Sequence, residues 1–408
     1  MKIHKITCLI FLFVVATHTP AQVITLDSVL NAIEQNHPML KMYEAQIRAI
    51  DDYSQMSKSW MPPTISVGPW QARYDNVKDG MWMTTVEQMI PNPIKQKASY
   101  NFMRSMSFIE AKEKKSKRNE MFAMAKQNYF EWVILKKKFA VLAQTDSLLT
   151  YIVKVAQSRY PYSKEKLNNI YKAQADLYEL HNMETMLTGE MRMKNIELNS
   201  LMNFDESRVF DIDTVIQIPY YEIQSPDTSA ILASRSDIQF FDASINLIRL
   251  QQKFEKTKSL PDISISFSHM NDLNNMANRY SLMGMISFPF VPWASKEYKS
   301  NIRSLNSKIN ALRYMRQALL VETTGMIASL QTSIQSTRAQ LQNYKENIIP
   351  TYYKSYQSSL LAYEQNTEDL FVVLDGLKML RMAMMNELDQ LNTLLKLQVD
   401  YEKQMEIR

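Results

Sequence analysis

The chain has 408 residues, with 47 basic and 42 acidic side chains, a formal net charge of +5 and only 6 glycines. This near balance of charge argues against a nucleic-acid-binding protein, which would carry a marked excess of basic side chains. So few glycines argue against a loop-rich enzyme and favour long helices.

Residues 1–21 predict a secretory signal peptide. Two lysines precede an apolar run over 6–16, and the small residue Ala21 ends the segment. The alternative is a short N-terminal anchor, although the run is too short for a comfortable membrane span. Cys8, the single cysteine, is unsuited to lipid attachment because the apolar run follows it. We therefore expect an exported chain without disulfides or a lipid anchor.

The rest of the chain repeats itself at an offset of 198 residues. Among the matching pairs are Pro63 with Pro261, Ser66 with Ser264, Pro91 with Pro289, and Tyr100 with Tyr298. An internal repeat of this kind indicates one structural unit built twice. We place the first repeat at 22–215 and the second at 216–408, each in the order helix, strand, strand, long helices.

The first repeat opens with a helical pattern from Leu26 to about Lys58, which the proline pair at 62–63 ends. Alternation and turn signals then predict strands at about 64–74 and 81–90. Long stretches without proline or glycine follow, and they predict helices at about 94–158 and 166–202.

The second repeat predicts the same elements in the same order. A helix is expected from about Ser229 to Lys258, then strands at about 262–270 and 280–288. Long helices are expected at about 295–361 and 368–405. The fold class is therefore mainly α with a small β part.

Four strands of about ten residues suit a membrane barrel but are too few to close one. Open sheet edges facing lipid would leave backbone groups unpaired. Three copies supply twelve strands, so a homotrimer is predicted, with the long helices forming a second, coiled-coil-like tube in water. The alternative for the strands is the edge of a soluble β-sandwich packed on helices.

The alternation in the strands assigns a face to each side chain. Ile65, Val67, Ile263 and Ile265 share one parity, which we assign to lipid. The opposite parity is assigned to a wet lumen and carries Ser66, Glu87, Ser264 and Ser266 together with the methionines Met83, Met283 and Met285.

In order and spacing the chain resembles the TolC-like outer-membrane efflux protein family over essentially its whole mature length. The matching stretches are 26–30, 36–38, 235–238 and 281–293, although the family often has proline where Ser236 stands. The resemblance implies a trimer with a 12-stranded outer-membrane β-barrel and a long periplasmic α-helical barrel. It implies a passive exit duct of a tripartite efflux pump, RND-type, in the outer membrane of a Gram-negative bacterium.

The resemblance also implies partners and an entrance. An inner-membrane pump and a periplasmic adaptor protein would dock at two helix-reversal tips. The family's motif, a tyrosine followed three residues later by glycine, appears as Tyr160 with Ser163 and Tyr363 with Asn366, so neither copy keeps the glycine. A type I secretion outlet is an alternative within the class, and an exported helical scaffold or adaptor without a pore is one outside it.

Asp375 matches the acidic ring that this family places at its closed entrance, with Asp369 as a second candidate at the constriction. Three carboxylates around a narrow opening favour cations. The family's companion aspartate is Val372 here, and the other interpretation of Asp375 is a solvated acid on a helix face.

The 28 methionines allow a soft-metal conduit, because thioethers bind Cu(I) or Ag(I), but methionine is also an adaptable apolar filler. The mature chain shows no Cys/His cluster, no glycine-rich phosphate loop and no evident nucleophile–base pair. We therefore expect neither enzyme activity nor a cofactor.

Overall fold

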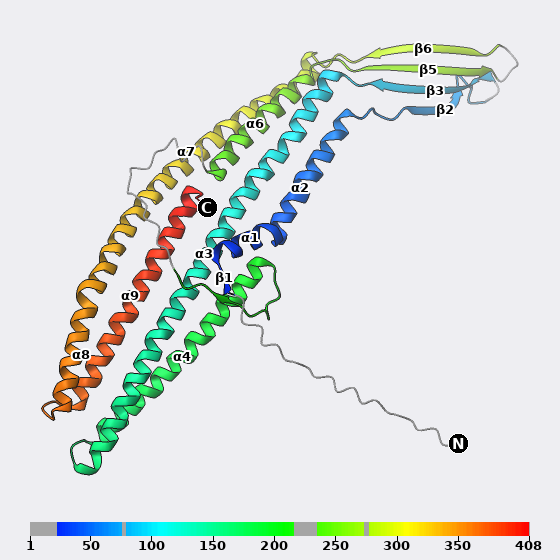
Figure 1. The fold of residues 1–408 in the computed structure, drawn as a ribbon. Helices are drawn as coiled ribbons and strands as arrows, with labels where there is room; N and C mark the ends of the chain where they lie inside the picture. Colours follow the sequence, from blue (N-terminus) through cyan, green and yellow to red (C-terminus); the bar gives the residue numbers. More distant parts are fainter. Residues whose placement is uncertain (1–22, 76–78, 216–234, 273–276, 408) are drawn as a thin grey trace, which may run out of the picture.

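The computed structural model describes residues 23–75, 79–215, 235–272 and 277–407. Long helices run side by side down the molecule, and a four-stranded sheet projects from one end of them (Figure 1). The expected signal peptide and the start of the helix expected from Ser229 lie outside the described residues.

The first repeat contains ten elements among the residues that the structure describes. In chain order they are β1 (Val23–Ile24), α1 (Leu26–Asn36), α2 (Pro38–Ser54), η1 (Gln55–Lys58), β2 (Thr64–Trp70), β3 (Met81–Ile90), α3 (Pro93–Arg159), η3 (Tyr160–Tyr162), α4 (Leu167–Met202) and β4 (Asp211–Ile212). At 1.5 Å per residue, the 67 residues of α3 extend about 100 Å.

The second repeat contains seven described elements. They are α6 (Ser236–Thr257), β5 (Ile263–Asp272), β6 (Arg279–Ile286), α7 (Pro292–Asn343), the π-helical turn η4 (Tyr344–Ile348), α8 (Ile349–Glu364) and α9 (Leu370–Met405). The order of helix, strand, strand and long helices predicted for both repeats is therefore present.

Two helices expected to be continuous are interrupted at prolines. The helix expected from Leu26 breaks at His37, whose Nδ1 accepts a hydrogen bond from the Met39 N–H at 3.2 Å and so caps α2. Pro38 begins α2, where its missing N–H costs nothing. The helix expected over 295–361 contains the wider π turn η4 just before Pro350. A proline ring collides with the carbonyl four residues earlier, and the π turn makes room for it.

The sheet is antiparallel throughout, in the order β2-β3-β5-β6. The expected first strand, 64–74, stops at Trp70, because Gln71 adopts a left-handed conformation with φ 56°. The two repeats do not superpose without a gap: an unbroken offset of 198 would pair Asp262 with Met285, whereas Met285 pairs with Ser264. The shift of two residues leaves every side chain on its expected face.

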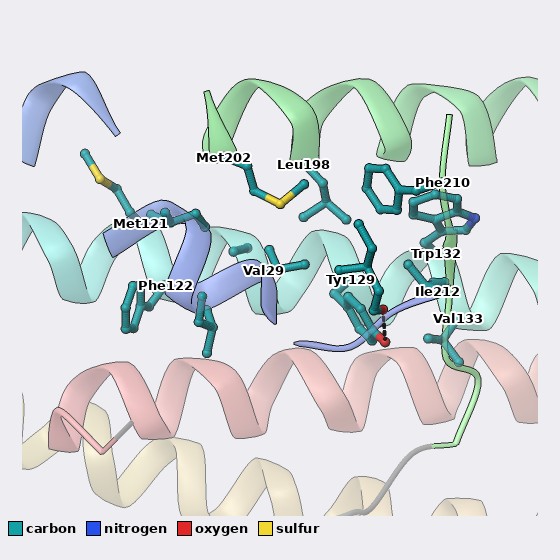
Figure 2. Packing of buried hydrophobic residues seen from close by; sticks show 14 of the residues in the cluster. Val29, Met121, Phe122, Tyr129, Trp132, Val133, Leu198, Met202, Phe210 and Ile212 are labelled. Atoms are coloured by element: carbon teal, nitrogen blue, oxygen red, sulfur yellow. Dashed lines mark hydrogen bonds between the residues drawn. The ribbon is translucent and has the colours of Figure 1, made fainter. Parts of the chain in front are cut away.

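The main core lies where α1 and α4 pack on the middle of α3 (Figure 2). Val29 and Leu198 are fully buried, and the rings of Trp132 and Phe210 lie 5.3 Å apart. The Tyr129 hydroxyl donates to the carbonyl oxygens of Ile24 at 3.1 Å and Asp213 at 3.2 Å, which fastens both strands of the small parallel β1–β4 sheet to α3.

One described segment, Pro93–Tyr162, is long and apolar enough to cross a membrane by length and composition alone. Packing accounts for its apolar side chains. Leu142 is fully buried in a cluster with Leu180 and Leu187 of α4, and Leu149 and Ile152 are buried in a second cluster with α9.

Candidate functional site: an amphipathic sheet and a tied helical tip

The sheet has two chemically distinct faces. One is apolar and exposed on all four strands: Ile65 is 67% exposed, Leu282 68% and Phe267 46%. The strand register aligns Ile65, Val86, Phe267 and Leu282 in one row across the sheet. We call this surface the apolar face.

The opposite face, the serine face, is polar and hollowed along β5. Ser264, Ser266 and Ser268 are only 8%, 3% and 2% exposed, although no other described element covers them. Larger side chains on β3 and β6 flank them, and the hydroxyls of Thr85 and Ser268 are hydrogen-bonded at 2.8 Å. The serine face is therefore recessed along β5, and in this sense we call it the concave side of the sheet.

The register places each sequence-assigned residue of the sheet. Met83, Met283 and Met285 lie on the serine face, as expected from their parity, with Met283 opposite Ser266 and Met285 opposite Ser264. Met83 is separate from these two and lies opposite Met270. Three further strand methionines, which sequence analysis did not single out, share the face: Met81, Met89 and Met270.

The sheet ends in two open edges. β2 pairs only with β3, and β6 only with β5, among the strands that the structure describes. Their outer N–H and C=O groups form a ladder with nothing to pair to in one chain. Such an edge is a template for another strand.

The helical layer is also open at both sides. In the lower half, α4 packs on α3, α3 on α9, and α9 on α7 and α8. Tyr171 and Tyr178 of α4, near the far end of the helices, are 61% and 66% exposed. Higher up, where α7 packs on α6, Tyr314 and Val321 of α7 are 73% and 67% exposed. Each pair is spaced by seven residues, the repeat of a coiled-coil seam.

At the far end, two tight turns reverse the long helices. Ser163 ends η3 with φ 58° and Asn366 follows α8 with φ 58°, both in the left-handed region. Tyr160 and Tyr363, three residues earlier, accept hydrogen bonds from the N–H groups of Ser163 and Asn366 at 2.9 and 3.0 Å. Both turns therefore have the same construction without glycine.

The two tips are tied together by side chains that sequence analysis did not identify. The Arg159 guanidinium donates to the backbone oxygens of Tyr363 and Glu364 at 2.9 and 3.1 Å, and to Asn366 Oδ1 at 2.8 Å. It also lies 4.4 Å from the centre of the Tyr363 ring. The only sequence signal was a charged residue beside the turn.

Tyr363, at the end of α8, also ties the two turns together through its own side chain. Its side chain is buried, and its hydroxyl donates to Glu165 Oε2 at 2.7 Å. Burial first, and then the hydrogen bond to the Glu165 carboxylate, raise the pKa of Tyr363 to about 12. The neutral phenol is therefore the form that holds the tips together.

Asp369 is a structural cap. It begins α9 by accepting a hydrogen bond from the Phe371 N–H at 2.9 Å, and it accepts others from Asn169 at 3.0 Å and Lys166 at 3.1 Å. The Phe371 N–H and the Lys166 ammonium lower the pKa of Asp369. Asp375, further along α9, is exposed. It lies on a helix face with the exposed apolar side chains of Phe371, Met379 and Met382.

Among the described residues, no group of three or more His, Cys, Asp or Glu side chains could hold a metal ion.

Solved structures give the class of fold. The chain matches CusC with a TM-score of 0.78 at 12% identity, covering 93% of this chain and 91% of CusC. It matches the CmeC outer-membrane channel of Campylobacter jejuni with a TM-score of 0.73 at 15% identity, covering 93% of this chain and 85% of CmeC. It matches the outer-membrane protein VceC of Vibrio cholerae with a TM-score of 0.72 at 13% identity, covering 93% of this chain and 95% of VceC. No family model matches the sequence, and no curated protein matches it significantly. The chain has the TolC-like fold of outer-membrane channels.

Proposed function

We propose that this protein is a homotrimeric outer-membrane channel, the passive exit duct of a tripartite efflux pump. The observation that carries the proposal is the sheet: it exposes an apolar face on all four strands and has two open edges. Lipid can cover the apolar face, and only other copies can supply hydrogen-bond partners for the backbone groups of the strand edges.

Three copies would form one wall of twelve strands. The serine face, being concave, would line the lumen, and the apolar face would meet lipid. A β-sandwich would need a second sheet against the apolar face, and none is present in the described chain. The likeness to solved outer-membrane channels supports the same arrangement.

The long helices would form a periplasmic tube below the barrel. Its closure would bring neighbouring copies against both sides of the helical layer, which would cover the seam at Tyr171 and Tyr178 near the tip and the seam at Tyr314 and Val321 higher up. In this position the tyrosines would bury large apolar rings at the interface.

The tied tips would be the periplasmic entrance. The contacts of Arg159 and Tyr363 would hold the two helical hairpins of one chain together and keep the opening narrow. Asp375 would contribute one carboxylate per chain near the constriction, whereas Asp369 serves mainly as a cap. An adaptor or inner-membrane pump would dock at the turns around Tyr160 and Ser163 and around Asn366.

An RND-type pump that exports small molecules or metal ions is the partner we favour, because the sequence resembles the TolC-like efflux family. A type I secretion outlet would use the same duct. The scaffold alternative predicts a monomer in water, which the open edges and exposed seams disfavour.

Disulfide cross-linking between copies tests the trimer. Because the two hairpins superpose with a shift of two residues, pairing β6 with a neighbour's β2 as β3 pairs with β5 puts Ile286 beside Pro69 of the neighbour, and both side chains are exposed in one chain. The variant Pro69→Cys/Ile286→Cys should give oxidised trimers in the outer-membrane fraction.

The control is Pro69→Cys/Phe267→Cys, which moves the second thiol to the inner strand β5. It should remain monomeric on a denaturing gel. Equal cross-linking of both variants, or a chain found only in the aqueous fraction, would contradict the proposal.

A further inference from the structure

Every methionine in the four strands of the sheet lies on the serine face. The six are Met81, Met83, Met89, Met270, Met283 and Met285. The apolar face has none, and branched and aromatic side chains cover it instead. The methionines are therefore confined to the concave wall.

This placement is the reverse of what packing alone would produce. Methionine used as a flexible apolar filler belongs where apolar surface is needed, and on this sheet that is the apolar face. The serine face carries hydroxyls and carboxylates, among them Ser266 and Glu87, whereas the strand amides of Gln88 and Asn271 lie on the apolar face. The thioethers on the concave side must therefore have a role other than apolar packing.

The register divides the six into a compact group and a dispersed one. Met83 lies directly opposite Met270 on the neighbouring strand, and Met81 precedes Met83 by two residues on the same face. Directly opposed Cβ atoms lie about 4.5–5.5 Å apart, and alternate residues of one strand about 7 Å apart. Three such flexible side chains can bring their sulfur atoms to one point.

The dispersed group lies nearer the helices. Met89 and Met285 flank Ser264 on opposite sides, and Met283 faces Ser266, so none of these three directly opposes another methionine. The dispersed group therefore offers a matched comparison, with the same chemistry on the same face but without a direct pair.

We propose that Met81, Met83 and Met270 form a thioether site for a soft monovalent metal ion, Cu(I) or Ag(I). Soft sulfur ligands select such ions over hard cations. The nearest charged residues across the strands are Asp272, opposite Met81, and Arg279, opposite Met270, so their formal charges offset one another. The ligands are neutral, which allows an ion to enter and leave.

The site rests on the proposed function for its location, since it would face the lumen near the end of the barrel away from the helices. It deepens that function by naming a cargo class. A channel with weak, repeated binding points along its wall passes an ion from one to the next.

Silver binding tests the site. The full-length protein, purified in detergent, is titrated with silver nitrate in chloride-free buffer by calorimetry, and sulfur ligation is checked by X-ray absorption. The variant Met83→Leu/Met270→Leu should bind the tightest silver ion at least about 10- to 100-fold more weakly, because even loss of a supporting partner of a ligand costs this much.

The control is Met283→Leu/Met285→Leu, which removes the same number of thioethers from the same face and should leave that affinity unchanged. Equal silver affinity in all three proteins, or an equal loss in both variants, would overturn the proposal. Conductance in planar bilayers is measured separately on the native protein and on each variant: unchanged conductance with lost silver binding supports the site, and a native protein that binds silver but forms no channel would contradict the proposed function alone.

Discussion

The sheet and the helical bundle use similar apolar residues in opposite ways. In the bundle Leu198 is fully buried between α3 and α4, whereas in the sheet Leu282 is 68% exposed. The bundle has its own core within one chain, but the sheet is a single layer without one. One polypeptide therefore carries a part with its own buried core and a part whose apolar face and strand edges are left open, and in the proposed function lipid and other copies would cover the second part.

The largest effect should come from placing a charge on the apolar face. Leu282→Arg should abolish outer-membrane assembly, because a cation at the bilayer midplane costs about 2–4 kcal/mol in each chain. Ser281→Arg places the same charge one residue away on the serine face and should assemble. Membrane fractionation and trimer bands on unheated gels measure both. Equal assembly of the two variants would refute our assignment of the faces.

The next largest effect should come from truncating a core side chain in the helical bundle. Leu198→Ala should lower the free energy of unfolding of the helical part by about 2–5 kcal/mol, since it leaves a cavity at a fully buried position. Met193→Ala, on the exposed side of the same helix, should change it by less than about 0.5 kcal/mol. Urea unfolding followed by helical circular dichroism measures both. Similar losses would mean that the bundle depends on other copies for its core.

The tip should loosen at alkaline pH. The pKa of Tyr363 is raised to about 12 in the folded chain, against 10.0 for a free tyrosine. The resulting stability is fully present below pH 10 and is lost as pH rises from 10 to 12. Two pKa units correspond to about 2.7 kcal/mol.

Bilayer conductance across this pH range measures the loosening. Conductance should rise in the native protein, whereas Tyr363→Phe should show no such step. Tyr162→Phe, which alters an exposed tyrosine at the same tip, should behave as the native protein. A step that persists in Tyr363→Phe would place the titrating group elsewhere.

The smallest effects concern the two aspartates. Asp369→Ala should cost about 1 kcal/mol through loss of the helix cap, and Asp375→Ala should leave stability unchanged but reduce cation selectivity. The pKa of Asp369 is lowered, so its contribution is present above pH 4 and is lost as pH falls below its folded value. Thermal unfolding and reversal potentials separate the two roles, and a destabilised Asp375→Ala would show that we have misplaced it.

The sequence predicts the strands and their faces because alternation is a local signal. The pattern at 263–268, with isoleucine or phenylalanine alternating with serine, has one consistent interpretation as a two-faced strand. The two-residue shift between the hairpins was not predictable, because side-chain parity is the same before and after it. The breaks at Pro38 and Pro350 were readable in principle from proline alone.

The tied tip was beyond sequence analysis for a different reason. Arg159 meets Asn366, and Glu165 meets Tyr363, across about two hundred residues of chain. No periodicity connects positions so distant, and each charged residue by itself suggests a solvated helix end. Only the packing of α3 against α9 brings the two turns within hydrogen-bonding distance.

The open edges at β2 and β6 have a consequence for biogenesis. A newly exported copy would cross an aqueous compartment with unpaired backbone N–H and C=O groups along two strand edges and with the apolar face of the same sheet exposed. Such surfaces favour aggregation over delivery. In the proposed function, the chain would therefore be most prone to aggregate before it inserts into the membrane. A chaperone that covers the two hairpins would be needed as much as the membrane itself.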